Sequence, residues 1–241
     1  MTGVGSPPEQ MLLDSPLMQA GGVDIVDGLL DATWLSALTD EALGLIAGAD
    51  GQESSRPDHA DWRGGHPPRR LLTSGAGPVQ DALYRASGLA EVLSARCGLP
   101  LRPSGDRGSY SYYARPGDFL GLHRDIATCD VTVLTVLHDE PAADDAGGTL
   151  VVYPGRMWEP LSAIRARPAD GALGVRLGVG QTALLLGGVV PHQVLPTAPG
   201  QVRIVSVLCF CAGHSFDPRG GRVIHDQRSH QTPARRSRQP S

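Results

Sequence analysis

The sequence of 241 residues predicts a mainly β fold with helices in front of it, in which the strands close as a sandwich or a barrel of jelly-roll type. After Pro103 the apolar pattern changes from a helical period to short runs rich in Tyr, Val, Thr and Leu. No helical pattern separates these runs, so the strands are expected to pair antiparallel. Glycine and proline, 31 and 20 residues, favour many turns and therefore short strands.

The first part of the chain is expected to be a lead followed by a strand and a helix. Residues 1–22 are rich in Pro, Ser and Gly and predict a flexible lead. Residues 23–26 predict a short strand. Asp31 begins an amphipathic helix, because apolar side chains recur at helical spacing from Trp34 to Ile46.

Two further segments complete a helical front that spans residues 23–100. Residues 51–74 show no period and predict a long loop, which is a candidate lid over a binding site. Pro78 occupies the first turn of a second helix that runs to about Arg96 and stops at Gly98.

The β core spans residues 103–212 and forms one domain with the helical front, over residues 23–217. The polar, Arg-rich tail of residues 218–241 is expected to be disordered. The predicted strands are bounded by Gly and Pro and lie at 109–115, 119–125, 130–138, 148–153, 173–177, 182–186, 190–195 and 202–210.

Composition excludes several classes of function. All 21 basic residues are arginine, which excludes chemistry that needs a lysine amine, such as Schiff-base formation or P-loop phosphate transfer. A formal net charge of -4 argues against nucleic-acid binding. No apolar stretch reaches the ~18 to 20 residues that a bilayer requires. A globular protein without nucleic-acid or membrane partners is therefore expected.

The N-terminus and the four cysteines predict the compartment. No basic region followed by an apolar region is visible at the N-terminus, so a cytoplasmic location is expected. Cys209 and Cys211 lie on one face of a predicted strand, at a spacing that does not match a zinc knuckle. Both are expected to be buried free thiols.

Two histidines and one carboxylate form the candidate metal site. His123 and Asp125 are two residues apart, which on a strand directs both side chains to the same side. His192 lies far downstream in another apolar run. Two histidines and one carboxylate on one face of an octahedron leave three adjacent positions open, as in non-haem Fe(II) oxygenases. A 2-oxo acid can take two of these positions and dioxygen the third.

Arg203 is the candidate residue for a second carboxylate. It lies eleven residues after His192 in an otherwise apolar strand, where a charge requires a partner. A guanidinium suits the far carboxylate of 2-oxoglutarate, and Tyr113 on a preceding strand offers a phenol donor to the same group. The competing interpretation is a structural ion pair with a carboxylate of the barrel, such as Asp118 or Asp130.

In their order along the chain, these motifs resemble those of the Fe(II)/2-oxoglutarate-dependent oxygenases and, among them, the prolyl-hydroxylase-like branch. The matching residues lie between Tyr110 and Phe210: Tyr113, Gly117-Asp118-Phe119-Leu120, His123-Arg124-Asp125, Gly147-Gly148-Thr149-Leu150, His192 and Arg203. The resemblance implies a double-stranded β-helix, a cupin-like barrel buttressed by N-terminal helices. It also implies Fe(II) on His123, Asp125 and His192 as the catalytic centre, 2-oxoglutarate on Arg203 and Tyr113, and O2 as the oxidant.

The implied reaction couples decarboxylation of 2-oxoglutarate, to succinate and CO2, with hydroxylation or another oxidation of an unactivated C–H bond. Asp125 separates the chain from halogenating relatives, which carry a small residue at that position. Val205 departs from the family, because many relatives carry Ser two residues after the Arg. The missing hydroxyl for the co-substrate is then expected to come from Tyr113, Thr132 or Thr135.

The substrate is expected to be a small molecule, such as an amino acid or an intermediate of secondary metabolism, and the oligomeric state is left open. Loops that would rim the barrel mouth concentrate guanidinium and aromatic groups, which are candidates for holding an anionic substrate: Arg69, Arg70, Arg124, Arg156, Trp62 and Trp158. Two alternatives remain open, a cupin-like metal enzyme that does not use 2-oxoglutarate and a catalytically silent barrel that acts as a binding module.

Overall fold

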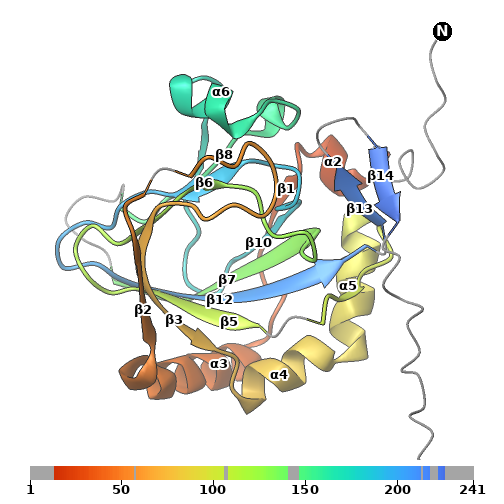
Figure 1. Ribbon diagram of the computed structural model, residues 1–241. Coiled ribbons are helices and arrows are strands. Elements are labelled where there is room, and N and C mark those ends of the chain that lie inside the picture. The colour runs from red at the N-terminus through yellow and green to blue at the C-terminus, as the bar shows by residue number, and fades with distance from the viewer. Residues whose placement is uncertain are drawn as a thin grey trace, which may run out of the picture.

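The computed structural model describes residues 14–56, 58–105, 108–140 and 147–212, and the backbone of residues 214–217 and 222–225. In these residues, antiparallel strands form a 12-stranded sheet that curls into a half-closed barrel (Figure 1). Helices α3 (Ala32–Leu45) and α4 (Pro78–Arg85) lie against one layer of the barrel, and α6 (Leu161–Ala166) covers the other. The predicted mainly β fold of the double-stranded β-helix type is confirmed.

The strands follow one another across the sheet in the order β1-β10-β7-β12-β5-β3-β6-β11-β8-β9, while β2 pairs with β3 and β4 pairs with β12. Their bounds are β1 Val23–Val26, β2 Asp50–Ser54, β3 Arg69–Gly75, β4 Arg102–Pro103, β5 Ser109–Tyr113, β6 Phe119–His123, β7 Val131–Glu140, β8 Leu150–Val152, β9 Leu173–Val175, β10 Thr182–Leu185, β11 His192–Val194 and β12 Val202–Cys211. The eight strands predicted for the core correspond to β5 through β12, in the expected order.

The first predicted helix of the front is observed, and the second is divided in two. The side chain of Asp31 accepts a hydrogen bond from Trp34 N at 2.9 Å and begins α3 as expected. The second helix is divided, because Ala86 is extended with a ψ of 119° and separates α4 from α5 (Ser87–Cys97). Gly98 has a φ of 68° and ends α5 in the left-handed conformation that glycine adopts readily.

The side chains of β5 alternate between the helices and the interior of the barrel. Tyr110 and Tyr112 point outward, and Tyr110 Oη donates a hydrogen bond to Oε1 of Glu41 on α3 at 2.6 Å. Ser111 and Tyr113 point inward and line the cavity of the barrel. The helices therefore bury one face of the sheet and leave the other face for the site.

Residues 51–74 do not form the continuous loop that was predicted. They contain most of β2 and β3, and β3 is a central strand that pairs with both β5 and β6. The apolar pair Leu71 and Leu72 directly follows Arg69 and Arg70, so the run is too short and too charged to show a strand period. The loop is limited to the residues between β2 and β3.

The described parts of both chain ends contain secondary structure. In the lead, α2 (Pro16–Gln19) buries Leu17, which is 2% exposed. After the core, β13 (His214–Asp217) pairs with β14 (Arg222–His225), so part of the predicted tail is a strand. Residues 1–13 and 226–241 lie outside the described residues. Two 3-10 turns, η1 (Ile46–Gly48) and η2 (Pro154–Arg156), complete the described elements.

The prediction of free thiols is wrong for one of the two strand cysteines. Cys209 on β12 forms a disulfide with Cys129, and their Cα atoms are 5.1 Å apart. Cys129 lies just before β7, whose Thr132 is opposite Cys209 in the β7–β12 pairing, and this brings the two sulfurs together. Cys211 is a buried free thiol as predicted. Among the described helices, none has the length and apolar character that crossing a membrane requires.

Candidate metal centre and co-substrate cavity

His123 and His192 face each other across two paired strands. His123 ends β6 and His192 begins β11, and the two residues are directly opposite in the antiparallel register. Between His192 and Val194 on β11 there is one residue, whereas β6 has two between His123 and Leu120. This bulge allows both Leu120 and His123 to point into the cavity, although they are three residues apart.

The three predicted ligands converge on one point. Oδ1 of Asp125 lies 3.6 Å from Nε2 of His123 and 3.6 Å from Nε2 of His192. One ligand atom of each residue lies within 4.8 Å of the others. Nδ1 of His123 lies 2.8 Å from Gly121 O, and Nδ1 of His192 lies 3.0 Å from Val190 O.

The histidine tautomers follow from these contacts. A carbonyl oxygen only accepts, so Nδ1 of each ring carries the hydrogen and Nε2 directs its lone pair at the common centre. Two imidazole nitrogens and one carboxylate oxygen, all at the wall of a cavity, fit a divalent metal ion of the type that non-haem Fe(II) enzymes hold.

Asp125 is fixed from three sides. Its backbone N donates to Gly187 O at 2.8 Å, and its Oδ2 accepts a hydrogen bond from Thr132 Oγ1. A Cβ at Gly187 would come within 1.7 Å of Oδ2, so only glycine leaves room for this carboxylate. The orientation of Asp125 toward the two histidines is therefore determined by its neighbours.

The electrostatics of the cluster suit a cation. Burial by itself would raise the pKa of Asp125, but the two histidines, His192 foremost, outweigh it and hold the pKa well below its ordinary value. Burial, together with the neighbouring His192, lowers the pKa of His123. Burial also opposes the charged form of His192, but the Asp125 carboxylate outweighs burial and raises the pKa of His192. The cluster therefore favours an ionised Asp125 and a neutral His123, which are the forms that bind metal ions, and a bound cation would displace any proton from His192.

A cavity of about 720 Å³, including the space that opens to solvent, connects the metal cluster with Arg203 and Tyr113. Arg203 on β12 and Tyr113 on β5 are directly opposite each other, and both are 3% exposed. Burial raises the pKa of Tyr113, so its phenol stays protonated and can donate a hydrogen bond. One end of the cavity thus offers metal ligands, and the other offers a guanidinium and a phenol.

Arg203 also has a protein partner. Its Nη1 donates to Oδ2 of Asp139 at 2.5 Å and to Leu177 O at 3.2 Å. The ion pair considered from the sequence therefore exists, but with Asp139 and with neither Asp118 nor Asp130. Asp118 accepts from the backbone of the β5–β6 turn, and Asp130 accepts from Arg63 and from the backbone N of Ala212.

The two threonines considered for the co-substrate differ in position. Thr132 lines the cavity at the metal end, where it binds Asp125 rather than a group next to Arg203. Thr135 lies on the opposite face of β7, outside the cavity, where its hydroxyl is 2.8 Å from Thr182 Oγ1. Ser109 and Ser111, which the sequence did not single out, supply further hydroxyls on the cavity wall.

The Gly147-Gly148 turn makes room for the far end of the cavity. A Cβ at Gly147 would lie 2.3 Å from Gln201 Oε1, and one at Gly148 would lie 3.1 Å from Arg203 Cδ. Gly148 also has a φ of 67°, which side chains rarely tolerate. Close packing against Gln201 and Arg203 therefore explains why glycines occupy this turn.

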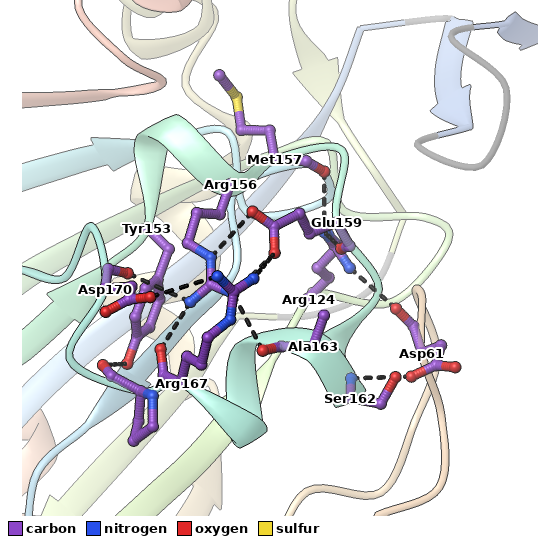
Figure 2. Close-up of polar contacts among 11 residues, drawn as sticks. Asp61, Arg124, Tyr153, Arg156, Met157, Glu159, Ser162, Ala163, Arg167 and Asp170 are labelled. Carbon is purple, nitrogen blue, oxygen red and sulfur yellow. Dashed lines mark hydrogen bonds and ion pairs between the residues drawn. The ribbon is translucent and has the colours of Figure 1, made fainter.

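Arg124 and Arg156 do not line the cavity, which corrects the expectation that they rim its mouth. Figure 2 shows the polar contacts that both residues make instead. Arg124 is 2% exposed and donates to four backbone carbonyls, those of Asp61, Met157, Glu159 and Val189. Arg156 is 6% exposed and binds the Glu159 carboxylate and the carbonyls of Ala163, Arg167 and Asp170. Both guanidinium groups hold the outer layer around α6 together.

The remaining substrate candidates occupy three different environments. Arg70 lies 3.3 Å from Oδ1 of Asp118 and binds Pro116 O in the β5–β6 turn. Arg69 is opposite the cavity-lining Leu120, so the two residues share the inner face of the sheet. Trp158 is 44% exposed on the outer layer, and Trp62 stacks on Arg124 with 5.2 Å between the ring centroid and Cζ.

Sequence reasoning missed four residues that support the site. Gly187 makes room for Asp125, and Asp139 binds Arg203. Arg176 binds the same carboxylate of Asp139 at 2.7 Å. Arg63 donates to the backbone carbonyls of Asp125, Ile126 and Cys129 and so holds the loop that follows the metal ligand. Of these four residues, only Gly187 could have been found from the sequence. It belongs to a Gly187-Gly188 pair that indicates a turn shortly before His192.

Comparison with known proteins finds similarity in structure. No protein-family model matches the chain, and no curated protein matches it in sequence. A prolyl-4-hydroxylase from Pseudomonas putida has a TM-score of 0.56 and 19% identity, covering 83% of this chain and 97% of its own. The epimerase SnoN of nogalamycin biosynthesis, in complex with Fe3+, alpha-ketoglutarate and a nogalamycin compound, has a TM-score of 0.58 and 14% identity, covering 81% of each chain.

EctD from S. alaskensis, with 2-oxoglutarate and 5-hydroxyectoine, has a TM-score of 0.57 and 15% identity, covering 88% of this chain and 79% of its own. At these identities the likeness establishes the fold. The chain resembles the Fe(II)/2-oxoglutarate oxygenases, prolyl hydroxylases included, in its double-stranded β-helix and in its His-x-Asp…His triad.

Proposed function

We propose that the protein is an Fe(II)- and 2-oxoglutarate-dependent oxygenase that hydroxylates an unactivated C–H bond of a small molecule. One observation carries the proposal. The His123, Asp125 and His192 cluster and the buried Arg203–Tyr113 pair line a single cavity of the same barrel. A 2-oxo diacid has two ends with different chemistry, and the cavity offers a matching group for each.

Each end of the cavity has a defined role in this proposal. His123, Asp125 and His192 would hold Fe(II), and Arg203 and Tyr113 would bind the far carboxylate of 2-oxoglutarate through a guanidinium and a phenol. Bound iron supplies the activation of O2, coupled to oxidative decarboxylation of the co-substrate, that side chains cannot perform.

The cavity walls between the two ends serve to exclude water. Leu120, Leu134 and Val194 line the cavity and keep its middle apolar. An apolar wall strengthens the interaction of Arg203 with an anion, because little water screens it. The protein thus contributes binding, orientation and a dry cavity.

The residues that line the cavity also limit the chemical class of the substrate. Among the described residues, Arg203 is the cation that lines the cavity, and the co-substrate would occupy it. The part of the substrate that reaches the iron is therefore uncharged, next to the hydroxyls of Ser109 and Ser111 and the side chain of Val207. An anionic group of the substrate, as expected from the sequence, would then lie outside this cavity. The neighbours' names include prolyl, nogalamycin and ectoine compounds, so fold likeness does not choose among substrates.

The test is an anaerobic titration of the metal-free protein with Fe(II) and then 2-oxoglutarate. A weak visible charge-transfer band of the iron chelate is expected, together with slow succinate release once O2 is admitted. His192→Ala should abolish the band because it removes one of three ligands. Bound iron without a band would instead support a metal enzyme that does not use 2-oxoglutarate, and no bound iron would support a silent barrel.

A further inference from the structure

We infer that Asp139 and Arg176 are positioning residues for the co-substrate: Asp139 fixes the guanidinium of Arg203, and Arg176 balances the charge of Asp139. The inference rests on the proposed function, in which Arg203 binds the far carboxylate of 2-oxoglutarate. It assigns roles to two residues that lie behind Arg203.

Asp139 lies at the centre of a buried network at the end of β7. Its carboxylate is 8% exposed, and its Oδ2 accepts from Arg203 at 2.5 Å and from Arg176 at 2.7 Å. Its Oδ1 accepts from Gln201 Nε2 at 3.0 Å. Arg176 is anchored a second time by Gly147 O, in the turn that makes room for Arg203. Asp139 is therefore held in place from several directions.

The charges explain why two arginines share one carboxylate. Asp139 and Arg203 alone would form a neutral pair, and a neutral pair attracts an anion only weakly. Arg176 adds a second positive charge on the same carboxylate, so the group of three carries a net charge of +1. The far carboxylate of 2-oxoglutarate carries -1, and the site is neutral when it is bound, as a buried site requires.

The positions of the two arginines support the same roles, with Arg203 at the cavity and Arg176 behind it. Arg203 is 3% exposed and lines the cavity, whereas Arg176 is about a third exposed and does not. Nη1 of Arg203 is also held by Leu177 O, so its guanidinium plane is fixed before a ligand arrives. Preorganisation of this kind reduces the free energy lost on ordering the side chain during binding. Arg176 acts through Asp139, without contact with the cavity.

The experiment compares two 2-oxo acids on the Fe(II)-loaded protein without O2, using the visible chelate band. One is 2-oxoglutarate and the other is 2-oxopentanoate, which has a methyl group in place of the far carboxylate. Arg176→Gln removes the charge and keeps hydrogen-bond donors, and Arg176→Gln with Asp139→Asn restores the net charge of +1. Arg85→Gln is the control, because Arg85 lies 70% exposed on α4.

Arg176→Gln should raise the concentration of 2-oxoglutarate at half-saturation about tenfold and leave that of 2-oxopentanoate unchanged. The double variant should return to within about threefold of the wild type, because neutralising Asp139 compensates for the lost arginine. An equal half-saturation concentration of 2-oxoglutarate in Arg176→Gln and Arg85→Gln would overturn the inference. So would a double variant that binds 2-oxoglutarate as weakly as Arg176→Gln does. Weaker binding of both 2-oxo acids would indicate a merely structural role and overturn it too. A wild type without any band would overturn the proposed function itself.

Discussion

Arg124 and Arg203 are both buried in the same barrel, 2% and 3% exposed, yet their surroundings differ completely. Arg124 lies between two residues that point into the cavity, His123 and Asp125, so its own side chain points outward. There the outer layer surrounds the guanidinium with carbonyl oxygens, those of Asp61 and Met157 among them (Figure 2). The ring of Trp62 lies against the same guanidinium. Burial lowers the pKa of Arg124 to about 10, so it remains charged at neutral pH.

Arg203 points to the other side of the sheet, into the cavity. Its Nη1 is bound by protein oxygens, and its side chain is part of the cavity wall. A guanidinium surrounded by carbonyls stabilises the fold, whereas one at a cavity wall is available to a ligand. The side of the strand, and not the residue type or the degree of burial, distinguishes the two roles.

The largest effect is expected from Arg203→Ala, which removes the positive charge from the cavity. The 2-oxoglutarate needed for half-saturation should rise on the order of a thousandfold, because a buried charge partner is lost. Fe(II) binding should persist, since Arg203 contacts none of the three ligands. Titration of the chelate band measures both. Arg203→Lys should recover part of the loss, and an unchanged requirement for 2-oxoglutarate would place Arg203 in the same structural class as Arg124.

Arg124→Ala should act on stability instead. Four backbone carbonyls lose their donor, and the free energy of unfolding should fall by about 3 kcal/mol. Urea denaturation measures this loss. The folded variant should need the same 2-oxoglutarate as the wild type. If stability were unchanged while substrate turnover disappeared, the assignment of Arg124 to the outer layer would be wrong.

Gly187→Ala tests how tightly the inner side is packed. The added Cβ would collide with Oδ2 of Asp125, so the carboxylate must move and Fe(II) affinity should fall by about a hundredfold. Gly155→Ala is the matched control, because a Cβ there meets nothing within 4 Å. The equilibrium dissociation constant of Fe(II), measured for Gly187→Ala and Gly155→Ala, tests this expectation. Equal affinities in the two variants would show that Asp125 tolerates displacement.

The smallest effect is expected at Thr132, whose hydroxyl donates to Asp125 Oδ2. Thr132→Val keeps the shape and removes the donor, which should weaken Fe(II) binding about tenfold. Thr132→Ser keeps the hydroxyl and should stay close to the wild type. Should Thr132→Val instead raise only the need for 2-oxoglutarate, Thr132 would serve the co-substrate, as the sequence predicted.

Local patterns were sufficient for most of the barrel and for bringing forward the three residues of the metal cluster. The short apolar runs of β5 through β12, bounded by Gly and Pro, depend only on neighbouring residues, and so does the spacing of His123 and Asp125. The order of His192 and Arg203 after them carried the resemblance to the oxygenases. β3 was missed because its apolar run is short and flanked by two arginines.

The sequence by itself determined the eight core strands β5 to β12, the start of α3, and the histidine, aspartate, arginine and tyrosine side chains that line the cavity. The tertiary structure alone decided the partners: Cys129 with Cys209 across 80 residues, Arg203 with Asp139 across 64, and Arg63 with the carbonyl of Asp125 across 62. The tertiary structure alone also distinguished the role of Arg203 at the cavity from that of Arg124 in the outer layer. The physical reason is that a strand's pattern depends on adjacent residues, whereas the partner of a buried charge depends on which distant strands and loops the closing barrel brings beside it.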